Sequence, residues 1–163
     1  MFQFQGIWLP DGEKHFPEWM KRNGELVDGR GSYQIKKWRA CLPWIKSWRA
    51  AVDVGAHVGL WSTQMMRRFE QIHAFEPVEA FRACFNENIP VNSHVLLYAN
   101  ALGAKAGKVA MRHDPADSGG THVIKGDSVT MRALDEFALA SIDFLKIDVE
   151  GMEHEVVEGA RET

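Results

Sequence analysis

The sequence is poor in cysteine and has no long apolar run. Its 163 residues include only two cysteines, Cys41 and Cys84, neither of them in a C-x-x-C pair or near histidines at metal-ligand spacing. We therefore expect free thiols in a reducing, cytoplasmic compartment and no metal site. No apolar run approaches the roughly 20 residues that span a bilayer, and the first residues lack the layout of a signal peptide. Neither a disulfide scaffold nor a membrane protein is expected.

The chain also lacks the middle glycine of a dinucleotide-binding turn. Residues 50–62 predict a buried strand, a glycine turn and a helix that begins near Gly59. The pattern is D-x-G-x-x-x-G, formed by Asp53, Gly55 and Gly59. His57 stands where a dinucleotide-binding turn has the glycine that contacts the diphosphate. That side chain crowds a diphosphate, and the preceding acid repels one. An amino-acid-bearing nucleoside without phosphate fits better, which favours S-adenosylmethionine, although an ordinary β-to-α turn can show the same pattern.

An acid follows the second expected strand, residues 71–75. Glu76 lies 23 positions after Asp53, where nucleoside-binding α/β units place the carboxylate that holds a ribose diol. Two carboxylate oxygens match two vicinal hydroxyls, and Pro77 ends the strand and shapes the turn. The alternative is a solvated acid at a strand end. The spacing from the first motif favours the ribose role.

The third expected strand, residues 95–99, runs into Asn100 and Ala101. Small residues there would let a purine lie against the backbone, and Asn100 could read the adenine edge. A plain turn after the strand is the alternative. Beyond it we expect an antiparallel pair, a third short strand and a flexible loop that could close over a site. The pair is residues 108–112 with residues 121–124, the third strand is residues 129–131, and the loop is residues 114–120.

A fourth buried strand is expected within residues 142–151, with two acids at its carboxyl end, Asp148 and Glu150. Open α/β sheets bind ligands at the carboxyl ends of their strands. Strand alternation predicts that both carboxylates point to the same face. Like charges at that spacing favour a bound cation, a substrate proton or the ammonium of a methionine. A helix is expected over 152–160.

Basic residues and tryptophan concentrate in the first fifty residues. This part carries nine Lys or Arg against five Asp or Glu, and five of the six tryptophans, whereas residues 51–163 carry ten against seventeen. Such a composition is compatible with nucleic-acid contact. Because the basic residues are scattered, we instead expect a helical cap over residues 1–49, packed on a domain formed by 50–163. The cap should have a short helix over 17–22 and a second helix, capped by Ser32 and broken at Pro43.

Six short segments follow one another between residues 50 and 160. They are VDVGAHVG at 52–59, FEP at 75–77, NALG at 100–103, LD at 134–135, IDVEGME at 147–153 and EGA at 158–160. This ordered set resembles the FkbM family of S-adenosylmethionine-dependent methyltransferases and is far more specific than any one segment. WLPD at 8–11 and GSYQ at 31–34 add a weaker similarity to short forms carried by bacteriophages.

The resemblance implies an α/β fold with a Rossmann-like class I methyltransferase sheet. It implies transfer of a methyl group from S-adenosylmethionine to a hydroxyl of a sugar, a glycan or another small molecule. Asp148, Glu150 and His154 are the candidates for a base that removes the hydroxyl proton. The expected cofactor-binding residues are Asp53, Gly55, Ala56, His57, Gly59, Glu76, Pro77, Asn100, Ala101 and Asp148.

The number of expected strands is smaller than in the family that the sequence resembles. A class I sheet has seven strands, whereas this chain supplies four core strands and the excursion at 104–131. The fourth strand would be a bare edge, so we expect a C-terminally incomplete domain or pairing with another chain, such as a homodimer through that edge. The alternative function is a non-catalytic cofactor-binding or assembly module. Nucleic-acid methylation is not expected, because an Asp/Asn-Pro-Pro-aromatic motif is missing after the fourth strand.

Overall fold

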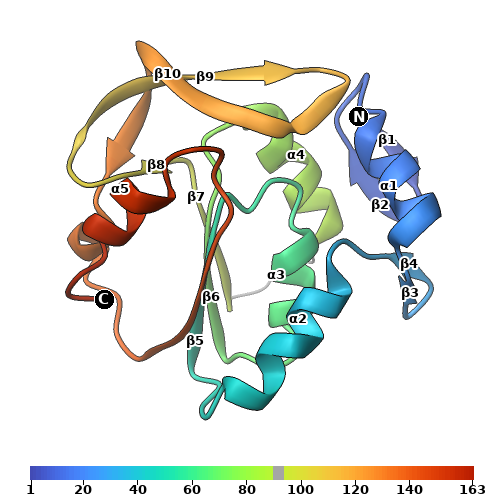
Figure 1. Ribbon diagram of the computed structural model, residues 1–163, viewed down its shortest axis with the longest axis horizontal. Helices are drawn as coiled ribbons and strands as arrows, with labels where there is room; N and C mark the ends of the chain where they lie inside the picture. The colour runs from blue at the N-terminus through green and yellow to red at the C-terminus, as the bar shows by residue number, and fades with distance from the viewer. Residues whose placement is uncertain (90–93) are drawn as a thin grey trace.

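A four-stranded parallel sheet forms the centre of the computed structural model, which describes residues 1–89 and 94–163. The strand order is β11-β5-β6-β7 (Figure 1). Their register places Val54, Phe75 and Tyr98 side by side, so the strands end at one edge. The strands are β5 (Ala50–Val54), β6 (Gln71–Phe75), β7 (Val95–Tyr98) and β11 (Ile142–Ile147). The four strands predicted from the sequence and the α/β class are thus confirmed.

Helices cover both faces of this sheet. In Figure 1, α2, α3 and α4 lie on one side and α5 on the other. All five residues of β5 are buried, and they alternate between the two faces. Ala51 packs with Trp38 of α2 and Trp61 of α3, whereas Val52 packs with Val156 of α5. The helices are α2 (Ile35–Cys41), α3 (Leu60–Met65), α4 (Glu79–Asn88) and α5 (Glu153–Glu158).

A long antiparallel hairpin crosses over the carboxyl end of the sheet (Figure 1). It consists of β9 (Gly107–Asp114) and β10 (Asp117–Arg132), and β10 also pairs with β8 (Ala101–Leu102). The predicted antiparallel pairing of residues 108–112 with 121–124 is confirmed. The predictions of a separate strand over 129–131 and of a flexible loop over 114–120 were wrong, because β10 includes residues 117–132 and only a short turn precedes it. Asp114 pairs directly with Asp117, and the glycines that suggested a loop lie at irregularities inside one strand. The brief helical turn η2 (Leu134–Phe137) follows.

The N-terminal part is only partly helical. Two small β-ribbons accompany its helices, so the predicted helical cap is corrected in this respect. Ser32 does not cap α2: its hydroxyl donates to the Glu25 carbonyl (2.6 Å) and closes the second ribbon, and Gln34 holds the cap position. The predicted break at Pro43 is confirmed, since α2 ends and a 3₁₀ turn begins. The elements are β1 (Phe2–Phe4), β2 (Ile7–Leu9), α1 (His15–Asn23), β3 (Leu26–Val27), β4 (Arg30–Gly31) and η1 (Leu42–Trp44).

Strand β11 is an edge of the central sheet. Among residues 1–89 and 94–163, only β5 pairs with it. Pairing of this edge with a second copy, the incompleteness of the domain and the boundary at residue 50 stay predictions. No helix in the described part of the chain is long and apolar enough to cross a membrane.

The packing of α5 generates a stability prediction. A Cβ at Gly159, just after α5, would lie 2.2 Å from the Gly103 carbonyl oxygen, which is backbone and cannot move aside easily. We expect Gly159→Ala to lower the free energy of unfolding by about 1–3 kcal/mol. Gly107→Ala is the matched control, because its Cβ would meet nothing closer than 3.6 Å. Urea unfolding of both variants measures the difference, and equal costs would contradict this packing.

Candidate active site

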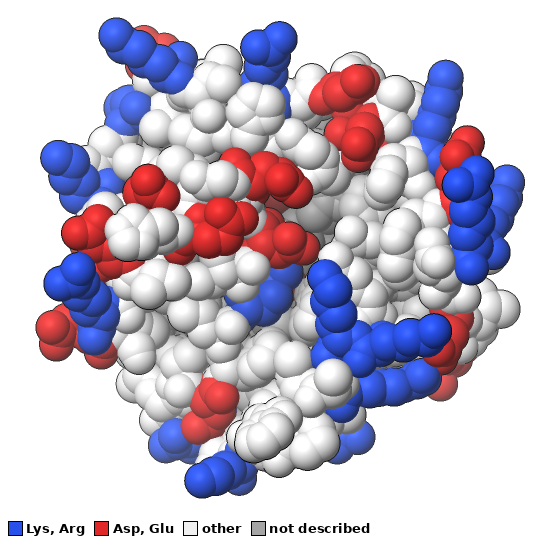
Figure 2. All heavy atoms as spheres, in the orientation of Figure 1, with Lys and Arg blue, Asp and Glu red and all other residues white. Residues whose placement is uncertain are grey.

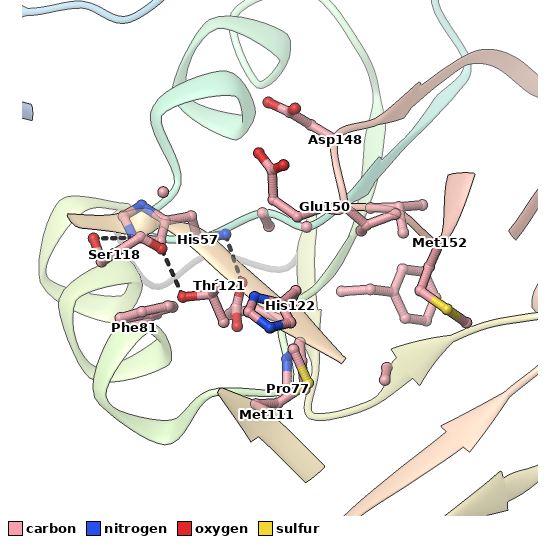
Figure 3. Close-up of a pocket in the computed structure, with 18 of the residues that line it drawn as sticks. His57, Pro77, Phe81, Met111, Ser118, Thr121, His122, Asp148, Glu150 and Met152 are labelled. Atoms are coloured by element: carbon pink, nitrogen blue, oxygen red, sulfur yellow. Dashed lines mark hydrogen bonds between the residues drawn. The ribbon is translucent and has the colours of Figure 1, made fainter. Parts of the chain in front are cut away.

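The carboxyl ends of β5, β6 and β11 open into one cavity. It encloses about 970 Å³ with its open mouth included. Figure 3 shows Asp148 and Glu150 on one side of it, and Met111 and His122 of the hairpin on the other. Phe16 from α1 also lines it. The wall is therefore built by the sheet, the hairpin and the N-terminal part together.

The turn after β5 requires glycine at one position. Gly55 has a φ of +72°, and a Cβ there would lie 2.2 Å from the Asp148 carbonyl oxygen. The backbone N–H groups of Gly55 and Ala56 both donate to the Phe75 carbonyl (3.1 and 3.0 Å). Glycine thus lets this turn touch the end of β11. Gly59 begins α3 and does not line the cavity, whereas Gly55 and Ala56 do.

Asp53 lies beneath the cavity and does not line it. Its side chain is fully buried, with Ser62 Oγ donating to Oδ2 (2.7 Å). Lys146 Nζ lies 2.9 Å from Oδ1 as an ion pair, although Oδ1 receives no well-aligned hydrogen bond. The ammonium instead donates to the carbonyls of Val54 (3.2 Å) and Gly55 (2.8 Å). Asp53 therefore reaches the cavity only through Lys146, and its predicted contact with a cofactor stays a prediction.

Lys146 lines the cavity and is absent from the sequence-based site. It is 8% exposed and stands directly beside Asp53 in the β11–β5 register. Buried lysine is rare unless it is paired. The signal available in the sequence was one lysine inside an otherwise apolar strand, but its partner depends on the strand register.

Glu76 extends from the tip of β6 into the cavity. It is 4% exposed, and its two oxygens accept N–H bonds from His57 (2.9 Å) and Val78 (2.8 Å). Burial raises the pKa of Glu76 to about 7, and these two hydrogen bonds oppose that rise. Arg82 donates to the carbonyls of Glu76 and Pro77, which fixes the turn. A carboxylate held in this way keeps free lone pairs for a ligand.

His57 forms part of the wall between two aromatic rings. Its ring stacks on Phe16 (4.9 Å between centroids) and meets the edge of Phe81 (4.4 Å). Nε2 lies 2.8 Å from Ser118 Oγ, a contact that Figure 3 marks with a dashed line. Burial lowers the pKa of His57 to about 3, so the ring is neutral. Because Ser118 donates its hydroxyl hydrogen to Glu13, we assign the remaining ring proton to Nε2.

Glu13 is a second site residue that the sequence did not reveal. Its carboxylate is 3% exposed and accepts hydrogen bonds from Phe16 N (3.0 Å), Ser118 N (2.8 Å) and Ser118 Oγ. Glu13 and Ser118 are 105 positions apart, so no local pattern could connect them. The hydrogen bonds join the start of α1 to the hairpin and, through His57, to the glycine turn.

Asp148 and Glu150 both line the cavity, but not as alternating residues of a strand. Strand β11 ends at Ile147, and the two acids lie exposed in the turn before α5. Figure 2 shows acidic side chains gathered across this region. His154 lies exposed on α5 and does not line the cavity. No group of three or more His, Cys, Asp or Glu in the described residues is arranged to hold a metal.

The remaining predicted residues, Pro77, Asn100 and Ala101, line the cavity. Asn100 Nδ2 donates to the Thr130 carbonyl (3.3 Å), which orients the amide toward β10. The structure therefore brings eight of the ten predicted cofactor-binding residues to one cavity and leaves Asp53 and Gly59 outside its lining. Direct contact of any of them with a cofactor stays a prediction.

Comparison with known families decides the relationship. The model of the methyltransferase FkbM domain matches residues 53–163. The chain belongs to the FkbM methyltransferase family. No curated protein matches this FkbM chain. A solved structure from Anaeromyxobacter dehalogenans, proposed to be a type II methyltransferase, is similar with a TM-score of 0.35 and 22% identity over 44% of this chain. The chain spans 29% of that protein's length.

The Asp53–Lys146 pair generates a prediction on stability. Lys146→Met leaves a fully buried carboxylate without a counter-charge, so we expect a loss of about 3–5 kcal/mol in the free energy of unfolding. Combining it with Asp53→Asn should recover much of the loss, because no buried charge remains. Exposed Lys105→Met is the control and should change stability by less than about 0.5 kcal/mol. Denaturant unfolding measures all three, and a single-variant cost equal to the control would contradict the pair's role.

Glu76 generates a prediction on pH. Its pKa is about 7 when folded and ordinarily 4.5, so the folded protein binds more protons between these values. Its contribution to the free energy of unfolding is fully present below pH 4.5 and is lost as the pH rises through 7. The stability of the wild type minus that of Glu76→Gln should therefore fall by at most about 3 kcal/mol over this range.

The titration of His57 changes the free energy of unfolding with pH in the direction opposite to that of Glu76. Its depressed pKa contributes stability above pH 6.5 that is lost as the pH falls toward 3. Both proteins contain His57, so subtracting the two unfolding curves isolates Glu76. Urea unfolding across the range measures the difference, and a flat or rising difference would contradict the assigned pKa of Glu76.

Proposed function

We propose that this FkbM chain is an S-adenosylmethionine-dependent methyltransferase that acts on a hydroxyl group of a sugar, glycan or other small molecule. The observation that carries the proposal is the Glu76 carboxylate. It stands at the tip of the second strand of a parallel sheet, is held by two backbone N–H groups and faces a cavity. In nucleoside-binding α/β folds this is the position that binds a ribose diol.

The cavity's donors and acceptors fit such a cofactor. Glu76 would accept hydrogen bonds from the two ribose hydroxyls. Ala101 and Leu102 offer a small, apolar surface for a purine, and Asp148 and Glu150 offer negative charge to a cationic group. When bound, S-adenosylmethionine supplies an electrophilic methyl group on a sulfonium. Among the described residues that line the cavity, Lys146 is the only Lys or Arg, and it pairs with Asp53, so no cluster of basic residues is there for a diphosphate.

The chain's own groups must also handle a proton. A hydroxyl that accepts a methyl group loses its hydrogen, and a carboxylate within hydrogen-bond reach can take it. Asp148 and Glu150 are proposed for this role because both line the cavity. His57 is a poor candidate, since its pKa is about 3 and the proton on Nε2 is directed to Ser118. His154 is not proposed, because it lies outside the cavity lining.

Titration calorimetry with S-adenosylhomocysteine tests the cofactor assignment. We expect binding to the wild type and at least tenfold weaker binding to Glu76→Ala, which loses both acceptors for the ribose diol. Glu79→Ala is the matched control, because Glu79 is exposed in the first turn of α4, three residues away. Its affinity should equal that of the wild type.

The reaction is tested with radiolabelled cofactor and hydroxylated acceptors. Transfer of label by the wild type, reduced in Asp148→Asn or Glu150→Gln while cofactor affinity persists, supports the proposed base. Binding without transfer to any acceptor would favour the non-catalytic module. A folded wild type that binds no S-adenosylhomocysteine would overturn the proposal.

A further inference from the structure

A second cavity lies beside the amino end of β5, away from the methyltransferase site. It lies among β3, α2 and the end of α3 and encloses about 880 Å³ with its open mouth included. The two cavities share no lining residue. Nothing in the proposed methyltransferase function uses it.

Its floor is aromatic. Trp38 of α2 is 5% exposed and Trp48, just before β5, is half-buried; both line the cavity. The Trp48 ring packs against Phe69, with 5.0 Å between ring centroids. These rings belong to the core between α2, α3 and the sheet. They are therefore held in place and offer a rigid, flat, apolar surface.

Its rim is basic. Arg39, Arg67 and Arg68 line the cavity, and no acidic side chain in residues 1–89 and 94–163 does. Arg39 pairs with Glu25 and Arg67 with Asp28, but these are solvent-exposed ion pairs of the kind that contribute little. Figure 2 shows Lys and Arg side chains gathered in the region of α2.

Arg68 differs from the other two arginines. Its guanidinium lies over the Trp48 ring, with Cζ 5.4 Å from the ring centroid. The guanidinium forms no ion pair or hydrogen bond with any residue in the described part of the chain. A planar guanidinium beside an aromatic ring suits a ligand that has both an oxyanion and a flat ring.

Gln64 provides an independent observation. It is 7% exposed, lines the cavity, and its carboxamide forms no hydrogen bond with any described residue. The neighbouring buried polar side chains of α3 do have partners, since Ser62 donates to Asp53 and Thr63 to the Gly59 carbonyl. The side chain is mostly buried, and its amide is free to donate to a ligand in the cavity.

We propose that this cavity binds an oxyanion that carries a flat apolar ring, such as an aryl phosphate. Arg68 and the Gln64 amide donate to the oxyanion, and Trp38 and Trp48 contact the ring. The exposed pairs of Arg39 and Arg67 allow those guanidinium groups to turn to the ligand. The site is separate from the cofactor cavity and selects the opposite charge.

Titration calorimetry with phenyl phosphate tests the proposal, with inorganic phosphate and phenol as the two halves of the probe. Phenyl phosphate should bind at least tenfold more tightly than either half. Arg68→Gln and Gln64→Leu should each weaken its binding about tenfold, because each removes donors to the oxyanion. Arg161→Gln is the matched control, since this exposed arginine lies beyond α5 and outside both cavities.

Thermal unfolding separates loss of the site from loss of the fold. Gln64→Leu should keep the melting temperature, because the substitution removes no hydrogen bond to a described residue. Phenyl phosphate that binds the folded wild type no better than phenol would overturn the proposal. So would Arg68→Gln and Gln64→Leu proteins that bind it as tightly as the control.

Discussion

The buried pair of Asp53 and Lys146 connects the two strands on which the proposed cofactor cavity depends. Register places the two side chains next to each other, on β5 and β11. The ammonium that neutralises Asp53 also holds the last carbonyl of β5 and that of Gly55. Because Gly55 has no Cβ, the turn then approaches Asp148 closely enough to bring the acidic turn to the cavity. One ion pair thus sets the relative position of the glycine turn and the acids.

The buried carboxylates of Glu76 and Glu13 both hold His57, which forms part of the cavity wall, Glu76 directly and Glu13 through Ser118. Glu76 accepts the backbone N–H of His57, and Glu13 accepts the hydroxyl hydrogen of Ser118, which in turn contacts the His57 ring. The N-terminal part, the hairpin and the glycine turn are therefore connected by one continuous set of hydrogen bonds. A neutral His57 suits this arrangement. Its single ring N–H has one acceptor, the Ser118 hydroxyl, and the rings of Phe16 and Phe81 that contact it are apolar.

Local pattern predicted the parts of this fold that depend on neighbouring residues. Apolar runs gave the four strands, and the spacing from Asp53 to Glu76 correctly placed the latter in a cavity. Contacts between distant residues were beyond such patterns: Lys146 depends on register, and Glu13 depends on how α1 meets the hairpin. Local sequence patterns also led to wrong predictions where the same residues are compatible with more than one secondary structure. Glycines at 119 and 120 suggested a loop, yet a long strand accommodates them as an irregularity.

The basic and acidic residues, which are unevenly distributed along the sequence, also lie in different parts of the folded chain. Arg39 lies far in sequence from Arg67 and Arg68, so the basic residues looked scattered, but α2 packs beside the end of α3 and brings all three to one cavity. The acids of the C-terminal half instead lie at the carboxyl end of the sheet. This separation of charge favours a cation at the proposed cofactor cavity and an anion at the second cavity, because like charges at either mouth disfavour the other ligand. The parallel sheet separates the two, since residues at opposite ends of its strands cannot share a site.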